Sequence, residues 1–201
     1  MTVFIWGSTG RLGRSVAKVF EQEAKVVAPT RQELDLRSKD DIQEAIEANR
    51  PSILINCAAW TDVDGCEKNP ELAKDINATL PQQLSELSKK VGAHLVHIST
   101  DFVFDGKTDI PYNEKQLPNP LSVYGKTKLD GEIGAGPSAT IIRTSWLQAQ
   151  DDSNMVKWIL ENFKKTGPVE VPNDRRANLT FVSDLLPVIK HFAESRYEGL
   201  V

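Results

Sequence analysis

The chain has 201 residues, of which 40% are hydrophobic and 26% are charged, and its formal net charge is −4 at pH 7. This length suits one domain, and the composition is that of a globular protein with a buried core. The acidic balance argues against a nucleic-acid partner, because nucleic-acid surfaces normally show a basic excess.

Short β-rich runs alternate with longer amphipathic stretches, which is the pattern of βαβ units and a parallel sheet. Strands are expected at residues 3–6, 26–28, 53–55, 94–98, 140–143 and 169–171, and a further strand opens at 199–201. Helices are expected after Gly10, after the N-cap Ser38, over 70–90 with a kink or break at Pro81, from near Leu121, over 156–163 and over 185–194. The alternation predicts an α/β fold with a doubly wound parallel sheet.

A glycine-rich turn, Gly7-x-x-Gly10-x-x-Gly13, directly follows the first strand and opens the first helix. Glycines there permit a tight turn and the close approach of backbone to a pyrophosphate, which then meets the helix N-terminus. The strand before and the helix after favour a dinucleotide site over a turn that merely needs glycine. The expected contacts in this turn come from Gly7, Thr9, Gly10, Arg11, Leu12 and Gly13.

Thr30 and Arg31 follow the second strand, where an acidic residue would accept hydrogen bonds from the adenosine ribose and repel a 2′-phosphate. A hydroxyl and a guanidinium favour the phosphate instead. We therefore expect NADPH, with NADH as the alternative; a solvated loop charge is the other interpretation of Arg31. Asp35 and Leu36 are expected to flank the adenine ring, with Asp35 accepting its exocyclic amine.

Tyr124 and Lys128 are four residues apart near the start of a predicted helix, so they share one face. An ammonium beside a phenol is expected to lower the phenol pKa from about 10, which makes Tyr124 a proton donor to a forming alkoxide. Thr100 lies at the carboxyl end of a predicted parallel strand, where such folds bind ligands, and its hydroxyl is expected to bond the same carbonyl oxygen. Together with the glycine turn, these residues predict carbonyl reduction by a nicotinamide cofactor.

The remaining polar and aromatic residues give weaker signals. The two cysteines lack zinc-site spacing and are too few for a disulfide framework, so they are expected to be reduced. The acidic residues at 62, 64 and 67 lack the other ligands of a calcium loop, and no metal is expected. Trp60 and Trp146 suit either stacking on a ligand or the core. With no signal peptide and no run of about 18 apolar residues, the expectation is a cytoplasmic protein without a membrane partner.

With these residues in view, the chain resembles the extended short-chain dehydrogenases/reductases and, more narrowly, the dTDP-4-dehydrorhamnose reductase family over essentially its whole length. The stretches that carry the resemblance are residues 56–64 (NCAAWTDVD), 99–106 (STDFVFDG), 120–132 (PLSVYGKTKLDGE) and 143–146 (RTSW). The resemblance implies that Thr100, Tyr124 and Lys128 are the catalytic triad. It further implies a cofactor site that includes Ala58, Ala59 and Asn77, together with Tyr124 and Lys128, and a substrate site that includes Val63, Asp64, Thr100, Asp101, Phe102 and Trp146.

The chain departs from this family in three ways. Phe102 stands where the family usually has Tyr, which removes a hydroxyl near the substrate. Residues 174–180 (DRRANLT) replace the family's Asp-Gln-x-Gly-x-Pro-Thr stretch, and family members continue beyond residue 201. The two new guanidiniums, Arg175 and Arg176, are expected to face a substrate diphosphate; a solvated loop is the other interpretation.

The sequence therefore predicts a Rossmann domain of the short-chain dehydrogenase type at residues 1–145. A reduced, partial substrate lobe at 146–201 is expected to pack on it, interleaved with the last Rossmann strand. The expected activity is NADPH-dependent reduction of the C4 ketone of a nucleotide-linked 4-keto-6-deoxysugar, as in deoxysugar biosynthesis, and a homodimer is compatible with it. One alternative is an NADP-binding regulatory role without turnover, because residues 120–132 are also similar to the β subunit of methionine adenosyltransferase. Another sugar-nucleotide oxidoreductase is the remaining alternative.

Overall fold

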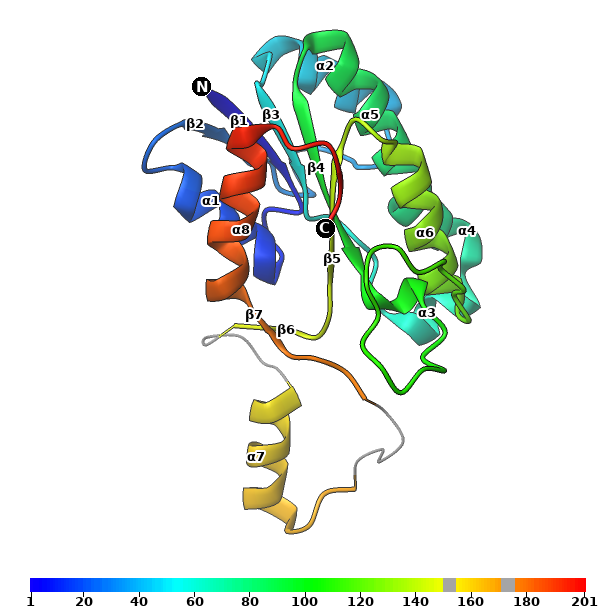
Figure 1. Ribbon diagram of the computed structural model, residues 1–201. Coiled ribbons are helices and arrows are strands. Elements are labelled where there is room, and N and C mark those ends of the chain that lie inside the picture. The colour runs from blue at the N-terminus through cyan, green and yellow to red at the C-terminus, as the bar shows by residue number, and fades with distance from the viewer. Residues whose placement is uncertain (150–154, 171–175) are drawn as a thin grey trace.

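The computed structural model describes residues 1–149, 155–170 and 176–201. Six parallel strands form the central sheet in the order β2-β1-β3-β4-β5-β8 (Figure 1). Their bounds are β1 Thr2–Trp6, β2 Lys25–Val27, β3 Ile53–Asn56, β4 His94–Thr100, β5 Thr140–Thr144 and β8 Gly199–Leu200. The chain goes from β1 outward to β2 and then crosses to β3 on the other side, so the doubly wound fold is confirmed. Folds of this kind bind ligands at the carboxyl ends of the strands beside such a reversal.

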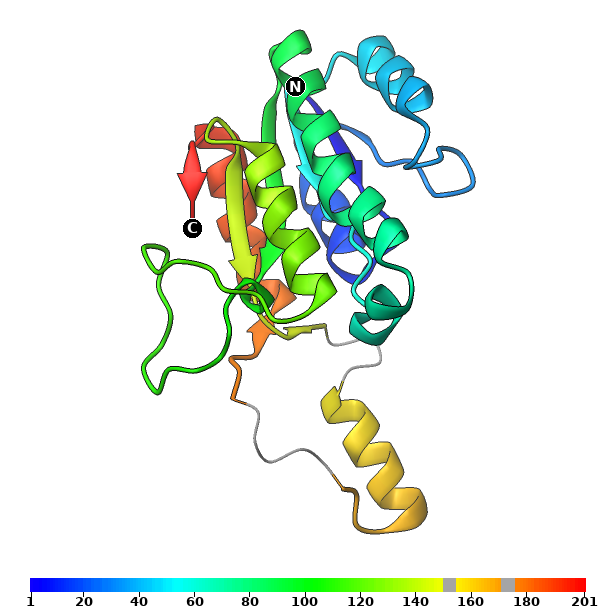
Figure 2. The same cartoon turned by 90° about the vertical axis from the view of Figure 1, so that its right-hand side faces the viewer.

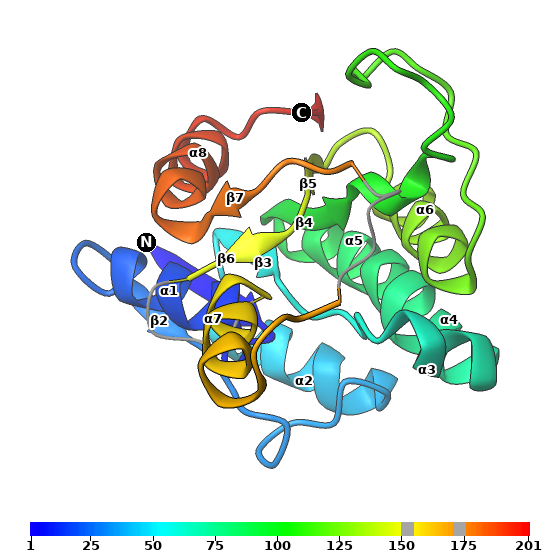
Figure 3. The same ribbon diagram turned by 90° about the horizontal axis from the view of Figure 1, so that it is seen from below.

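Helices cover both faces of the sheet (Figure 3). On one face lie α1 (Arg11–Phe20) and α8 (Val182–Ser195); on the other lie α2 (Lys39–Asn49), α5 (Leu80–Val91) and α6 (Val123–Ala135). Successive residues of a strand point to opposite faces, so Val3 and Ile5 pack with α1 and α8 while Phe4 and Trp6 pack with α2 and α5. β1 and β3 are nearly continuous apolar runs because both faces of the sheet are buried there.

Most predicted elements are confirmed within one to three residues at their ends. Ser38 caps α2 as expected, because its hydroxyl accepts from the backbone N–H of Asp41. The strand expected at 169–171 is wrong for residues 169 and 170, which lie outside any strand, and residue 171 lies outside the described residues. The sequence pattern also missed α3 (Val63–Lys68) and a two-stranded parallel sheet of β6 (Leu147–Gln148) and β7 (Thr180–Phe181). These elements are too short to show a period.

The helix expected over 70–90 contains the predicted irregularity, but as a π-helical turn. It begins as α4 (Pro70–Lys74), passes through the π-helical η1 (Asp75–Thr79) and continues as α5. Pro81 has no N–H to donate to the carbonyl of Asn77 four residues earlier. That carbonyl faces Gly131 of α6 so closely that a Cβ at Gly131 would lie 2.1 Å from its oxygen. The glycine therefore lets α6 pack directly on η1.

One helix stands apart from the sheet and its covering layers, below the carboxyl ends of the strands (Figure 2). This helix, α7 (Met155–Thr166), exposes large apolar side chains: Trp158 is 50% exposed and Phe163 is 58% exposed. Within the described residues, no helix combines the length and apolar character needed to cross a bilayer.

We expect Gly131→Ala to lower the free energy of unfolding by about 1–3 kcal/mol, because the added methyl overpacks the α6–η1 contact. This loss outweighs the roughly 1 kcal/mol by which alanine favours a helix over glycine. Urea unfolding measures the change. Gly134→Ala, on the same helix, is the control: its Cβ would come no closer than 3.0 Å, to a side-chain carbon of Gln82. Equal stability of the two variants would contradict the prediction.

Candidate active site

The glycine turn lies where the loops after β1 and β3 meet. Gly7 has φ of 75°, and a Cβ on it would lie 2.6 Å from the backbone nitrogen of Ala58. A Cβ on Gly13 would lie 2.2 Å from the carbonyl oxygen of Gly7. Only glycine fits both positions, and the Gly10 N–H closes the turn by donating to the Gly7 carbonyl over 3.0 Å. The turn is therefore formed by backbone without side chains at Gly7 and Gly13. It lies beside β1, where the strand order of the sheet reverses.

Helix α1 begins at this turn with Gly10 as its N-cap, which has no side chain to accept from the first N–H groups. Uncapped N–H groups of this kind bind anions at helix N-termini. The other predicted contacts of the turn differ in exposure: Thr9 is exposed, whereas the Leu12 side chain is buried in the core. The Arg11 guanidinium donates to the carbonyl of Leu147 over 2.8 Å, which ties α1 to the segment after β5.

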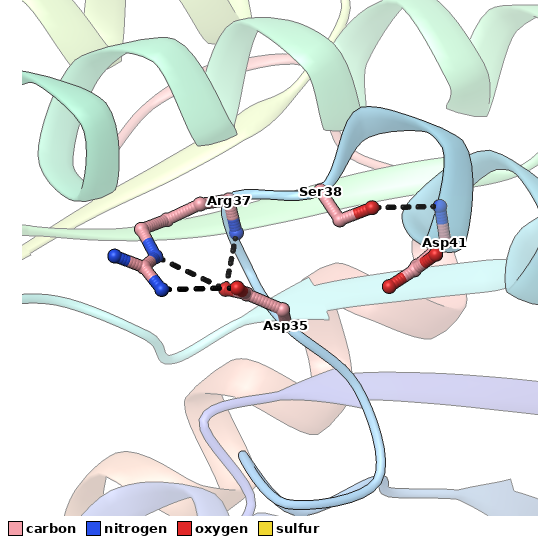
Figure 4. A network of polar contacts seen from close by, with 4 residues as sticks. All are labelled: Asp35, Arg37, Ser38 and Asp41. Carbon is pink, nitrogen blue, oxygen red and sulfur yellow. Dashed lines mark hydrogen bonds and ion pairs between the residues drawn. The ribbon is translucent and has the colours of Figure 1, made fainter.

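The segment after β2 carries the predicted adenosine contacts. Arg31 is exposed, and Leu36 is half-buried against the core. Both Asp35 carboxylate oxygens accept from the guanidinium of Arg37, over 3.2 and 3.0 Å (Figure 4). Sequence reasoning missed Glu33, whose carboxylate accepts from the Thr30 N–H over 2.8 Å and so brings an acidic group beside the proposed phosphate contacts.

Asn77 braces the loop after β3. Its side-chain oxygen accepts from the Trp60 N–H over 2.9 Å, and its amide donates to the Trp60 carbonyl over 3.1 Å and to the Thr127 hydroxyl over 3.3 Å. Asn77 therefore fixes the backbone that follows Ala58, which is buried, and Ala59, which is half-buried. Its predicted contact with the cofactor stays a prediction.

Tyr124, in the first turn of α6, is 7% exposed, and its ring meets that of Phe102 edge-on at 5.4 Å. Burial raises the pKa of Tyr124 to about 12, against the hydrogen bond with Thr100, which lowers it. The expectation that Lys128 lowers this pKa is wrong, because the Lys128 ammonium donates instead to the Ile98 carbonyl over 2.7 Å. The phenol is therefore protonated at neutral pH.

The carboxyl ends of β4 and β5 are joined through Asp101. The Thr100 hydroxyl donates to one Asp101 oxygen over 3.2 Å, and the Ser145 hydroxyl donates to the other over 2.8 Å. Trp146 follows with φ of 43°, a left-handed conformation that is strained for a bulky residue. This conformation redirects the chain from β5 into β6.

A buried ion pair that sequence reasoning missed connects the carboxyl ends of β4 and β5 to α6. Arg143 on β5 makes two hydrogen bonds to Glu132 on α6, over 2.9 and 2.6 Å, and Ser99 on β4 donates to the same carboxylate over 2.5 Å. The two charged side chains are 12% and 7% exposed. A charged residue at the end of an apolar strand, Arg143, was the available signal, because a buried charge needs a partner.

The remaining predicted substrate contacts are less closely grouped. Val63 packs half-buried in the cluster around Tyr124, and Asp64 is exposed in the first turn of α3. Arg176 pairs with Asp109 over 2.9 Å at the surface. Arg175 lies outside the described residues. In the parts of the chain that the structure describes, no group of His, Cys, Asp or Glu is arranged to hold a metal ion.

Known proteins match this chain over most of its length. The family model described as the RmlD substrate-binding domain matches residues 1–199. The dTDP-4-dehydrorhamnose reductase of Aggregatibacter actinomycetemcomitans is 34% identical over 98% of this chain and 69% of its own length. The Salmonella typhimurium enzyme of the same name is 35% identical over 87% of this chain and 61% of its own length. The chain thus spans about two thirds of these relatives.

Solved structures agree closely with the fold. The dTDP-4-dehydrorhamnose reductase of Bacillus anthracis, determined in complex with NADP, superposes with a TM-score of 0.94 at 33% identity. It is matched over 99% of this chain and 72% of its own. The ortholog from Clostridium acetobutylicum gives 0.94 at 36% identity, over 100% of this chain and 72% of its own.

We expect Glu132→Ala to lower the free energy of unfolding by about 3–5 kcal/mol, because it leaves the Arg143 charge buried without its partner. Chemical denaturation measures this loss. Asp109→Ala removes a carboxylate whose pair with Arg176 is 95% and 85% exposed, so it should cost less than about 1 kcal/mol. A Glu132 variant no less stable than the Asp109 variant would show that the buried pair does not hold α6 to the sheet.

Proposed function

The chain belongs to the RmlD substrate-binding domain family, and on that premise we propose that it reduces the C4 ketone of a nucleotide-linked 4-keto-6-deoxysugar with NADPH. Relatives named dTDP-4-dehydrorhamnose reductase support the reaction and the substrate class. The NADP complex of the Bacillus anthracis reductase supports the cofactor. The single observation that carries the proposal is the glycine turn packed on Ala58, with the buried Tyr124–Thr100 pair on neighbouring elements of the same sheet edge.

The backbone around Gly7 suits a dinucleotide. A Cβ at Gly7 or Gly13 would collide with backbone atoms, so the turn stays narrow and a pyrophosphate can approach the N–H groups of α1. Ala58 and Ala59, in the loop after β3, carry small side chains. In our proposal these residues hold the diphosphate and the nicotinamide half, while Arg31 and Asp35 take the adenosine half.

The proposed mechanism divides the work among three side chains. NADPH supplies a hydride to the carbonyl carbon when bound. Tyr124 donates its phenolic proton to the carbonyl oxygen, which yields the alcohol and leaves a phenolate. Thr100 donates a hydrogen bond to that oxygen, and Lys128 binds the nicotinamide ribose. The raised pKa of Tyr124, about 12, keeps the proton available for transfer at neutral pH.

Residues 146–201 form the proposed partial substrate lobe, although α8 and β8 also complete the Rossmann layers. Val63, Asp64, Asp101, Phe102 and Trp146 are the proposed sugar contacts. Arg175 and Arg176 are the proposed diphosphate contacts. The regulatory alternative is not favoured, because the relatives matched over most of the chain carry the names of reductases.

Tyr124→Phe should reduce turnover by roughly 100-fold or more, the scale of general acid catalysis. The affinity for NADPH should stay nearly unchanged, because the ring still fills its place against Phe102. Steady-state kinetics with a nucleotide-linked 4-ketosugar and fluorescence titration of NADPH measure the two effects. Wild-type turnover in the variant would remove Tyr124 from the proposed role. Tight NADPH binding by a wild-type chain that reduces no such sugar would favour the regulatory alternative.

NADPH should bind more tightly than NADH, and Arg31→Ala should reduce this preference by about tenfold, the effect of losing one charged hydrogen bond. Fluorescence titration of both cofactors measures the preference. Arg50→Ala, at the C-terminal end of α2, removes an exposed guanidinium away from the glycine turn and serves as the control. An NADH affinity equal to that for NADPH, unaltered in the Arg31 variant, contradicts the assignment.

A further inference from the structure

Three buried polar side chains lie in a row behind the candidate site, and the proposed reaction leaves two of them without a role. Asn56 ends β3, and His97 lies opposite it in register on β4. Both are 0% exposed, and Lys128 on α6 is 1% exposed. Asn56 Nδ2 is 3.1 Å from His97 Nδ1, and His97 Nε2 is 3.4 Å from Lys128 Nζ. The three side chains therefore form a continuous contact from β3 through β4 to α6.

The direction of these hydrogen bonds is fixed at one end by the backbone. The Ala58 N–H lies 3.1 Å from Asn56 Oδ1, and an N–H can only donate. The amide oxygen of Asn56 must therefore face Ala58, so its NH₂ group donates to His97 Nδ1. Burial, with Lys128 nearby, holds the pKa of His97 well below its usual value. A neutral imidazole that accepts at Nδ1 carries its proton on Nε2, the nitrogen facing Lys128.

This tautomer determines whether His97 Nε2 offers Lys128 Nζ a hydrogen-bond donor or an acceptor. An ammonium has only donors, so it bonds the Ile98 carbonyl but finds no acceptor on His97. A neutral amine has a lone pair that accepts the Nε2–H, so the contact favours the amine. Burial lowers the pKa of Lys128 to about 8, while Glu132 on the same helix and Cys57 after β3 oppose the shift. The contact with His97 and the burial thus act in the same direction, because both favour the neutral amine.

We propose that His97, held in its Nε2–H tautomer by Asn56, is a positioning residue that favours release of a proton from the Lys128 ammonium. The role of this proton release in catalysis rests on the proposed function. When Tyr124 gives its proton to the carbonyl oxygen, the Lys128 ammonium turns from the Ile98 carbonyl toward Tyr124, one helical turn away. It then returns a proton to the phenolate and becomes the amine. Solvent then restores the proton to Lys128. An ammonium stabilised by an acceptor at position 97 would be the weaker acid for this step.

The tautomer itself is testable in the wild-type chain without cofactor. Long-range ¹H–¹⁵N correlation spectra of ¹⁵N-labelled protein distinguish the two tautomers of His97 between neutral and mildly alkaline pH. We expect the proton on Nε2. A proton on Nδ1 overturns the proposal. This measurement requires no turnover, so its outcome is independent of whether the proposed reaction is correct.

Two neutral variants test the effect on Lys128. His97→Gln offers an amide oxygen that accepts from the ammonium, and Asn56→Leu removes the donor that fixes the tautomer. Each should raise the proton affinity of Lys128 about tenfold, close to the scale of one hydrogen bond to a charged group. Titration of the Lys128 ¹³Cε signal measures this shift. The alkaline limb of the kcat profile should move to higher pH, with the NADPH KM nearly unchanged.

His94→Gln is the matched control, because His94 is also buried on β4 but bonds Thr140 over 2.8 Å. It should leave the titration of Lys128 unchanged. If Lys128 titrates as in the wild type in both test variants, or shifts equally in the control, His97 has only a structural role. Should one test variant fail to fold, the other variant and the wild-type tautomer decide the outcome.

Discussion

The close contact between the loops after β1 and β3 is the constraint on which the rest of the site depends. Backbone meets backbone at Gly7 and Ala58, and a side chain at Gly7 would separate them. Because the two loops are in contact, α1 begins close to the carboxyl ends of β1 and β3. The Ala58 N–H donates to the Asn56 side chain. One steric requirement thus shapes the glycine turn and fixes the first hydrogen bond of the Asn56–His97–Lys128 row.

The second requirement is that charges inside the fold have partners. Helix α6 carries both Lys128 and Glu132 inward, where both side chains are buried. Glu132 accepts hydrogen bonds from two residues, Ser99 on β4 and Arg143 on β5, so it links three elements. Among the described residues, Lys128 bonds a backbone carbonyl but has no carboxylate in hydrogen-bond contact. This difference explains why Glu132 serves as a structural anchor, whereas the charge on Lys128 is poorly stabilised and suited to proton exchange.

Strong periodic patterns made most of the fold predictable from the sequence. The glycine turn, the strand ends and the Tyr124–Lys128 spacing place the main groups at one edge of the sheet because parallel strands share a direction. Contacts between distant residues were not predictable in this way. The Asn77 brace on Trp60 and the Glu33 carboxylate on Thr30 depend on how loops fold back. The pKa of Tyr124 was expected to fall, because spacing shows proximity but not burial or where an ammonium points.

The π-helical turn η1 restricts the length of the chain as well as the residue at position 77. It holds one more residue per turn than the helices on either side, and that residue brings Asn77 to Trp60 while its carbonyl lies on Gly131. Removing any one residue from 75–79 would rewind the turn and rotate α4 by about 100° relative to α5. A deletion in this turn would therefore displace the Asn77 side chain from Trp60 even where Asn77 itself is kept. Related chains that use this brace should therefore align through η1 without a gap.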